Sequence, residues 1–422
     1  MTAMGLIQGV KRALYRDDIS NEHSYPLDDK INLQIIGGNR SRYTHVFSNN
    51  AAHLYAKLTE EEATATLKQL LCIDIEKASL ASVAQAVAED YITKKSETMK
   101  AHTLMKQETI TTFEGAQKCD NGGENMSLAQ RLEELDARAD KDRVIQDAID
   151  GKLEGAESGA LSRTVVYGSP DGTGVPGLKK ELSVNGKNGG GAKTFEAKIG
   201  SVFRQGFSEG CLPILSNGEI SRVPFTTKYI GTVNKIDQFA PQFTEFAKYY
   251  GVCSSADVVF IADGATWIWN MLKKLCPNAI CIIDFYHATK NLNIIVDKLR
   301  FHSVDKREKF RDECHRFLEL GKIDQLELLI KSKTSASNAK SIDKLLDYFT
   351  ENADKMRYGL FRAAGLFIGS GVIEAACKTI VGKRMKNAGM HWSKKNAEGV
   401  IALRCAIYSD ELDSFDSNLI PA

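Results

Sequence analysis

The chain has nine cysteines but no Cys-x-x-Cys pair, so it lacks the ligand spacing of a zinc ribbon or zinc finger. It also lacks an excess charge of either sign, since 55 lysines and arginines face 54 acids. Any affinity for nucleic acid must therefore come from local basic patches. No apolar run approaches the roughly 20 residues that a bilayer-spanning helix needs, and no signal peptide opens the chain. We expect a cytoplasmic protein without a membrane partner.

Two phosphate-binding patterns are also missing. The glycine-rich stretch at 185–193 does not end in Gly-Lys-Ser or Gly-Lys-Thr, so it is not a P-loop. The segment 171–174 (DGTG) lacks the order of glycine and threonine found in actin-like ATPases. What remains is a chain of 422 residues, 43% hydrophobic and 26% charged, which is the composition of a soluble globular protein with two or three domains.

The first 160 residues indicate a mainly helical N-terminal region. Apolar residues recur every three or four positions between residues 51 and 105, which predicts amphipathic helices. Residues 126–150 predict a further, highly charged helix with Ser127 as its N-cap, and residues 153–162 predict a linker. A DNA-binding role and a plain packing role are both open for this region.

From residue 161 the pattern changes to short strands, and their order predicts an α/β fold. An apolar run at 258–262 predicts a buried strand that ends in Asp263-Gly264. Alternating patterns before that run predict antiparallel strands, and another buried strand follows it. The predicted elements are strands at 163–170, 192–205, 221–233, 258–262 and 279–287, and helices at 239–252 and 267–275. A sheet with an antiparallel half and a parallel half fits an RNase H-like core.

Residues 291–365 lack strand patterns and predict an all-α insertion into that core. A final helix is expected at 369–389, with Ser370 as its N-cap and Gly389 as its stop. The resulting boundaries are 1–160 for the N-terminal region, 161–290 and 366–410 for the two parts of the catalytic core, 291–365 for the insertion, and 411–422 for a tail.

Three acids fall at informative places in these elements: Asp171 after the first strand, Asp263 after the buried strand, and Glu374 in the final helix. Carboxylates are the preferred ligands of hard cations such as Mg²⁺ and Mn²⁺. Three of them from different elements can hold two ions that activate a nucleophile at a phosphodiester. Each acid taken alone is equally typical of a turn or of the first turn of a helix. The prediction of a metal site therefore depends on whether the fold brings the three together.

Five motifs in this part of the chain resemble those of one known family. They are DGTGVP (171–176), DGAxWIWN (263–270), IxDFYHA (282–288), GSGVIEAACKxxVxxRMKxxGMxW (369–392) and AEGVIALR (397–404). Their wording and order over residues 163–408 resemble the DDE transposases of bacterial insertion sequences, specifically the ISKra4 group, which is related to Mutator-like and IS256-like transposases.

That resemblance implies an RNase H-like fold, a catalytic triad of Asp171, Asp263 and Glu374, and dependence on Mg²⁺ or Mn²⁺. The implied activity is DNA strand cleavage and strand transfer at the ends of an insertion sequence, with element-end and target DNA as partners. Because two ends must be joined, a homo-oligomer associated with the nucleoid is expected. The family usually carries cysteine-rich and helix-turn-helix segments before DGTGVP, and residues 1–160 lack that cysteine pattern.

A further signature links two more residues to catalysis. In the Mutator-like and IS256-like groups, an acid or cysteine lies three residues before a histidine and follows the second acid. Asp284 and His287 match this signature and are candidates for positioning DNA or the scissile phosphate. The alternative is that His287 is a core histidine at a helix end.

A basic strip follows the proposed third ligand, because residues 377–404 carry only one acid, Glu398. If this strip neutralises DNA phosphates, binding will depend on salt. The alternative is that the strip is the solvated face of a helix. Trp392 is a candidate for stacking on an unpaired base, with burial in the core as the alternative. The candidate DNA-contacting residues are Lys378, Lys383, Arg384, Lys386, Trp392, Lys394 and Lys395.

Two rival functions are open. One is a catalytically inert, transposase-derived DNA-binding regulator, which the altered N-terminal region favours. The other is a metal-dependent nuclease that performs no strand transfer. The presence of all three acids favours the catalytic interpretation.

Overall fold

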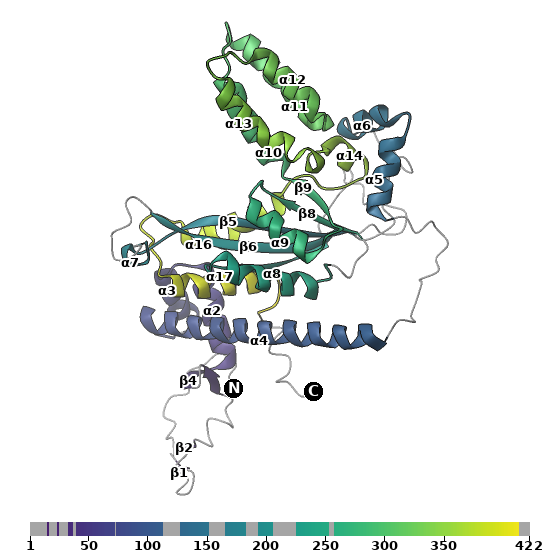
Figure 1. The fold of residues 1–422 in the computed structure, drawn as a ribbon. Helices are drawn as coiled ribbons and strands as arrows, with labels where there is room; N and C mark the ends of the chain where they lie inside the picture. Colours follow the sequence, from purple (N-terminus) through teal and green to yellow (C-terminus); the bar gives the residue numbers. More distant parts are fainter. Residues whose placement is uncertain are drawn as a thin grey trace.

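The structure is a computed structural model of residues 1–422 (Figure 1). It describes residues 15–16, 23–24, 33–36, 39–71, 73–112, 127–151, 165–182, 193–205, 225–252 and 257–412. The predicted linker at 153–162 lies outside the described residues, as do nearly all of the glycine-rich stretch at 185–193 and of the tail at 411–422.

A five-stranded mixed sheet forms the centre of the molecule, in the order β7-β6-β5-β8-β9 (Figure 1). The central strand β5 pairs antiparallel with β6, which pairs antiparallel with β7. On its other side β5 is parallel to β8, and β8 is parallel to β9. The predicted combination of an antiparallel and a parallel half is confirmed. The strands are β5 (Val165–Pro176), β6 (Thr194–Gln205), β7 (Phe225–Thr232), β8 (Val258–Ala262) and β9 (Ile280–Ile283).

The central strand is longer than the sequence predicts. The strand predicted at 163–170 ends before Asp171, but β5 continues through Asp171 and stays paired with β6 as far as Pro176. The glycines in this segment allow a close approach of the neighbouring strand. A Cβ atom on Gly172 would lie 2.6 Å from the side chain of Glu196, and one on Gly174 would lie 3.0 Å from a side-chain atom of β6. They leave room for side chains of the neighbouring strand.

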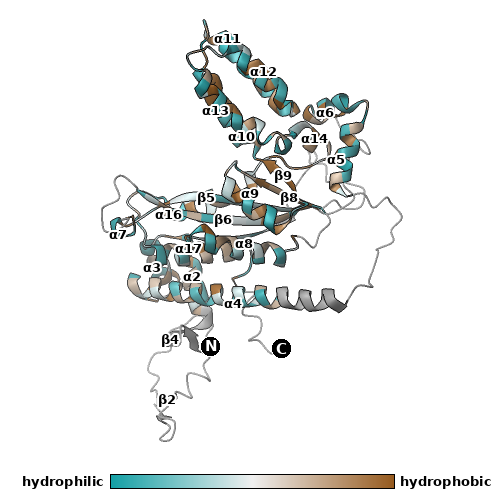
Figure 2. Cartoon of the chain, viewed as in Figure 1, coloured by the Kyte–Doolittle hydropathy of each residue, from teal (hydrophilic) through white to brown (hydrophobic). Residues whose placement is uncertain are grey.

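Apolar burial places β8 inside the fold. All five of its residues are buried, and Figure 2 shows apolar residues concentrated in β8 and β9. One hydrophobic cluster joins these strands to the helices that follow each of them and to the helix before β8. These helices are α8 (Ile236–Tyr249), α9 (Thr266–Leu275) and α10 (Phe285–Lys298).

The N-terminal region is mainly helical, as predicted, and packs on the sheet domain. Its helices are α2 (His45–Lys57), α3 (Glu60–Leu71), α4 (Lys77–Thr112), α5 (Leu128–Ala137) and α6 (Lys141–Ile149). Ser127 caps α5 as expected, in a capping box with Gln130. Four short strands precede these helices: β1 (Tyr15–Arg16), β2 (His23–Ser24), β3 (Leu33–Ile36) and β4 (Asn39–Thr44).

A buried ion pair holds α4 against the sheet domain. The Lys95 ammonium lies 2.7 Å from the Glu411 carboxylate, and both side chains are almost inaccessible to solvent. Helices α2 and α4 also share a hydrophobic cluster with the C-terminal helix α17 (Lys394–Tyr408). These contacts support the packing role of the region, and its DNA-binding role stays a prediction. Within the described stretches, no helix combines the length and apolar character required to cross a bilayer.

Four helices project from the edge of the sheet as a helical arm (Figure 1). The arm consists of α10, α11 (Val304–Leu320), α12 (Ile323–Lys333) and α13 (Ala339–Thr350), and a short 3-10 turn (Ala353–Lys355) and α14 (Tyr358–Ala363) follow it. Residues 291–365 are all described and contain no strand, as the sequence predicts. The first arm helix starts at Phe285, so the strand predicted at 279–287 is too long by its last residues.

The helix predicted at 369–389 is shorter and less regular than expected. Helical residues run without a break from α15 (Gly371–Ala376) through a π-helical turn (Cys377–Gly382) to α16 (Lys383–Met385). The reason is visible in the buried Arg404 of α17, whose guanidinium donates to the carbonyls of Ile380, at 2.7 Å, and Thr379, at 2.6 Å. Ser370 precedes α15 but makes no side-chain cap hydrogen bond, and Gly389 has a φ of 77° beyond the helix end. A short helix α7 (Lys179–Leu182) completes the described elements.

Candidate active site at the edge of the parallel strands

Asp171 and Asp263 lie at equivalent positions on neighbouring strands. Gly168 of β5 pairs with Phe260 of β8, and each aspartate follows its paired residue by three positions. Paired residues of adjacent strands lie side by side. The Asp171 and Asp263 carboxylates are therefore neighbours at the same level of the sheet. Burial raises the pKa of the Asp171 carboxyl, and the nearby negative charge of Asp263 raises it further. The fold therefore brings the first two predicted ligands together.

The Asp171 carboxylate also contacts the chain segment that carries Glu374. Its Oδ1 accepts the Gly172 N–H at 2.7 Å, and its Oδ2 accepts the thiol of Cys377 at 3.6 Å. Burial, and then the Asp171 charge, raise the pKa of that thiol far above its usual value, so Cys377 stays a neutral donor. Glu374 lies three residues earlier, in the first turn of α15. The hydrogen bond from Cys377 to Asp171 thus connects the C-terminal end of α15 to the central strand β5.

Asp284 is a helix cap rather than a free carboxylate. It is fully buried and precedes α10 as its N-cap. Its Oδ1 accepts the backbone N–H of His287 at 2.7 Å and lies 3.0 Å from the Nδ1 atom of the same residue. Its Oδ2 accepts the backbone N–H of Ser370. Burial alone would raise the pKa of Asp284, but the hydrogen bonds from His287 and Ser370 outweigh it and lower the pKa.

His287 lies close to the acids, and its Nε2 atom is not the one that Asp284 binds. The hydrogen bond to Asp284 raises the pKa of its imidazole, and the charges of Asp263 and Asp171 raise it further against the opposing effect of burial. Its side chain is 38% exposed. Since Nδ1 is used by Asp284, Nε2 is the atom that can meet a ligand. His287 is thus at a helix end, as the alternative for it foresaw, and it is also next to the predicted catalytic acids.

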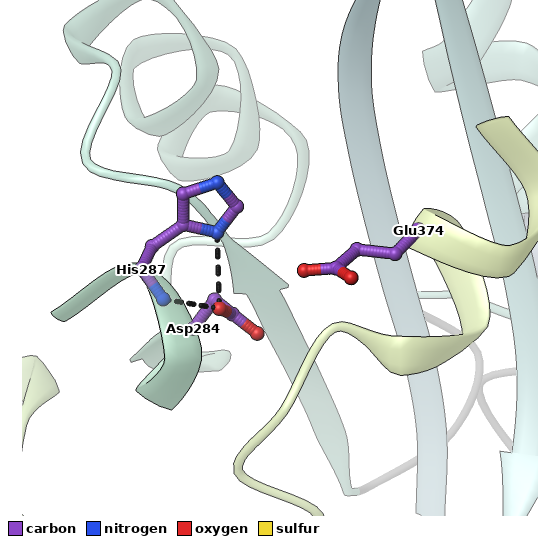
Figure 3. Close-up of side chains that lie close together, drawn as sticks. All are labelled: Asp284, His287 and Glu374. Atoms are coloured by element: carbon purple, nitrogen blue, oxygen red, sulfur yellow. Dashed lines mark hydrogen bonds and ion pairs between the residues drawn. The ribbon is translucent and has the colours of Figure 1, made fainter. Parts of the chain in front are cut away.

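The closest set of metal-ligating atoms in the described part of the chain belongs to Asp284, His287 and Glu374. One ligand atom from each lies within 4.8 Å of the others, and Figure 3 shows the Glu374 carboxylate directed toward the Asp284–His287 pair. Asp171 and Asp263 are outside this set but act electrostatically on His287. The five predicted catalytic residues therefore share one site. The predicted metal triad itself stays a prediction.

Five lysines of the basic strip lie on the surface: Lys378, Lys383, Lys386, Lys394 and Lys395. Two of them flank the acids directly. The Lys378 ammonium is 3.5 Å from the Glu374 carboxylate, and Lys386 donates to the Thr173 hydroxyl at 2.7 Å, two residues beyond Asp171. The contact of the five lysines with DNA stays a prediction.

Arg384 and Trp392 are buried, so their proposed contact with DNA is wrong, and the alternative given for Trp392, burial in the core, is confirmed. Arg384 is only 2% exposed, donates to the Tyr55 carbonyl at 3.1 Å, and has its guanidinium 4.9 Å from the centre of the Trp392 ring. Trp392 is 7% exposed, and its indole N–H donates to the Met385 carbonyl. Arg384 instead anchors the C-terminal end of α2, which the sequence does not reveal, and Trp392 packs on its guanidinium.

Three neighbours of the site escape prediction from the sequence. Ser370 binds through its backbone, which leaves no side-chain signal. Cys377 has a weak signal, since its spacing of three residues from Glu374 puts both on one helix face. Tyr348 comes from the distant helix α13 and covers the Asp263 turn, where a Cβ atom on Gly264 would lie 2.2 Å from its ring. Burial, together with the Asp263 charge, raises the pKa of Tyr348 to about 12.

Comparison with known proteins adds no relative. No protein-family model matches the chain, and no curated protein matches its sequence. The function must therefore be inferred from the site and from the motifs.

Proposed function

We propose that the chain is a DDE-type transposase, which cuts DNA strands at the ends of an insertion sequence and joins them to target DNA. One observation carries the proposal. Five side chains from four separate elements lie close together near the carboxyl ends of β8 and β9: Asp171, Asp263, Asp284, His287 and Glu374. A packing role explains Asp284, which caps α10, but it does not explain why three further carboxylates should lie close to it, because like charges oppose one another.

The fold is consistent with this function. A central strand with two antiparallel neighbours on one side and two parallel neighbours on the other supports an RNase H-like core. In it, the first acid lies on the central strand, the second follows the adjacent parallel strand, and the third lies on a helix near the C-terminal end. That distribution suits a two-metal site built from three elements.

The donor set fits Mg²⁺ or Mn²⁺, which prefer carboxylate oxygens. The proposed ligands are Asp171, Asp263 and Glu374. The raised pKa of Asp171, caused by burial and by Asp263, records a repulsion that a bound cation would relieve. When bound, the metal lowers the pKa of the attacking water or 3′-hydroxyl and stabilises the leaving oxygen.

The other residues bind and orient the DNA. Asp284 holds the His287 ring by its Nδ1 atom and favours the protonated imidazole, so that Nε2 donates to a phosphate oxygen. Lys378 and Lys386 neutralise neighbouring phosphates on either side of the acids. A DNA strand would therefore cross the parallel edge of the sheet. Because two element ends must be joined, the working form would be a homo-oligomer on DNA.

An excision assay in cells tests this function. A plasmid carries the insertion sequence between two reporter segments, and the chain is supplied in trans. Asp263→Asn keeps the acceptor for the Ala265 N–H, which Asp263 Oδ1 now binds at 3.0 Å, but removes a metal-binding charge. We expect excision to fall by about a thousandfold, whereas Asp343→Asn, at an exposed position on α13, should leave it unchanged.

The same assay addresses the rival functions. Full excision by Asp263→Asn would contradict the catalytic role of the site. DNA binding without excision by either protein would favour the regulator. Strand cutting without joining would favour a nuclease.

A further inference from the structure

The far end of the helical arm brings two connectors together. The Asn338 side chain, between α12 and α13, donates to the Lys298 carbonyl at the end of α10 at 3.1 Å. This hydrogen bond places the connector 299–303 beside the connector 334–338. We call these two connectors and the helix ends that flank them the arm tip. In Figure 1 the arm extends away from the sheet, so the arm tip is remote from the catalytic acids.

The arm tip contains a cleft of about 720 Å³. Basic and polar side chains line it, together with the first turn of α11, whose N-cap is Ser303. The N-terminus of a 17-residue helix carries a partial positive charge that favours anions. Phe301, which lines the cleft, packs on the buried Phe310 with ring centroids 5.3 Å apart. The lining residues that matter for charge are Asp297, Arg300, His302 and Arg307.

Two arginines balance the two acids near this cleft. Arg311 binds the Asp297 carboxylate at 3.0 Å and the Glu308 carboxylate at 2.5 Å, and Arg307 lies 3.5 Å from the Glu308 carboxylate. By contrast, five exposed basic residues make no ion pair with any described acid, and Asp305 is the remaining acid of the arm tip. The five are Lys298, Arg300, Lys306, Lys333 and Lys340. The arm tip is thus strongly basic in a chain whose net charge is only +1.

The arm fixes how far this basic surface lies from the reacting groups. His287 and Lys298 are on the same helix, eleven residues apart, which corresponds to about 16 Å at about 1.5 Å per residue. In duplex DNA this length equals about five base pairs. A duplex whose strand lies at the acids would therefore reach the arm tip within half a helical turn.

We propose that the arm tip binds the phosphate backbone of duplex DNA, starting about five base pairs from the cleavage site. The position relative to cleavage rests on the proposed function; the binding itself does not. Clustered guanidinium and ammonium groups beside a helix N-terminus recognise phosphate oxygens. Phe301 packs inward, so the arm tip exposes no phenyl or indole ring, and the small imidazole of His302 is its one exposed ring on which an unpaired base could stack. The surface therefore fits a duplex better than a single strand.

Matched double variants of the full chain test the proposal. The tip variant is Arg300→Glu with Lys306→Glu. The control is Arg316→Glu with Lys344→Glu, which makes the same charge change at exposed positions elsewhere on the arm. Lys306 is three residues after the N-cap Ser303, where glutamate favours helix capping, so the tip variant should fold. Thermal unfolding checks both proteins.

Binding is measured by fluorescence anisotropy with labelled duplexes from the element ends, at several salt concentrations. For duplexes that extend about 15 base pairs beyond the cleavage site, we expect the tip variant to bind about tenfold more weakly. Its slope of log K against log salt should fall by about two, and the control should change little. For duplexes that extend only about three base pairs, the tip variant should bind like the wild type.

Three results of the binding measurements would overturn the proposal. Equal losses of DNA affinity in both variants would mean general electrostatic attraction, and no loss of affinity in the tip variant would mean that DNA does not reach the arm tip. If inorganic phosphate stabilises only proteins with an intact arm tip while DNA affinity is unaffected, the cleft is a small-anion site. If the tip variant alone binds DNA more weakly but the wild type cuts no strand, the arm tip binds DNA and only the proposed function is contradicted. Absence of DNA binding by the wild type would overturn both.

Discussion

The buried carboxylate of Asp284 accepts the backbone N–H of Ser370 and so ties the start of α10 to the residue before α15. Helix α10 carries His287 three residues after this bond, and α15 carries Glu374 four residues after it. One carboxylate therefore fixes the positions of two groups that lie within 4.8 Å of it and of each other. Asp284 is best described as a positioning residue of the site.

Replacing Asp284 should change the ionisation of His287. Asp284→Asn removes the charge of the group whose hydrogen bond is the largest cause of the raised pKa. We expect the pKa of His287 to fall toward the ordinary value of 6.5, and strand cleavage to fall about tenfold or more through misplacement of the ring. The measurement is an NMR titration of the imidazole. An unchanged pKa would show that Asp284 does not control the ring.

Metal binding should offset the repulsion at Asp171. Asp171→Asn removes a desolvated charge beside Asp263, so we expect the variant to unfold at a higher temperature than the wild type in EDTA. Magnesium at ten times its Kd should stabilise the wild type by about 1.4 kcal/mol and the variant by much less. Thermal unfolding with and without Mg²⁺ tests this, and Mg²⁺-induced stabilisation of the same size in both proteins would exclude Asp171 as a ligand.

Arg384 and Lys386 are two residues apart, but we expect Arg384 to stabilise the fold and Lys386 to contact DNA. Arg384→Met breaks the buried contacts to Tyr55 and Trp392 and should cost about 2–4 kcal/mol of unfolding free energy. Lys386→Met should cost little stability but lower the salt slope of DNA binding by about one. Denaturant unfolding and salt titrations check both values. A reduced salt slope in folded Arg384→Met would reinstate Arg384 as a DNA contact.

Much of the fold follows from sequence periodicity, because local patterns report local structure. The apolar run at β8, the alternating strands β6 and β7, and the amphipathic helices of the arm were all predictable for this reason. The π-helical turn was not, since it depends on Arg404 binding the Thr379 and Ile380 carbonyls from a separate helix. Tertiary contacts of this kind leave no local periodic signal.

The candidate site divides in the same way. Asp263 was predictable because a buried strand ends just before it, whereas Asp284 and His287 were candidates because they match a signature of the families that the chain resembles. The burial of Arg384 was not, because it requires α2, more than 300 residues earlier in the chain. A basic strip in sequence does not distinguish a lysine on the surface from an arginine that caps another helix.

A partly buried acid outside the site should make stability depend on pH. Burial raises the pKa of Glu398 above the ordinary value of 4.5, although its carboxylate accepts hydrogen bonds from Thr232 and Val233. A carboxyl with a raised pKa holds its proton more tightly in the folded protein, so unfolding free energy falls as pH rises from 4.5 through the folded pKa. Glu398→Gln does not titrate. We expect the stability of this variant relative to the wild type to improve between pH 4 and pH 7, as measured by denaturant unfolding, and a constant difference would contradict this.

The most direct measurement is strand cleavage of labelled element-end DNA by the purified chain with Mg²⁺ or Mn²⁺, beside a Glu374→Gln variant. Glutamine keeps the size of the side chain but removes the charge that a metal ligand needs. We predict metal-dependent cleavage by the wild type and none by the variant, with similar DNA binding in both. Cleavage of equal rate by Glu374→Gln, or DNA binding without any cleavage by the wild type, would contradict a transposase active site at this edge of the sheet.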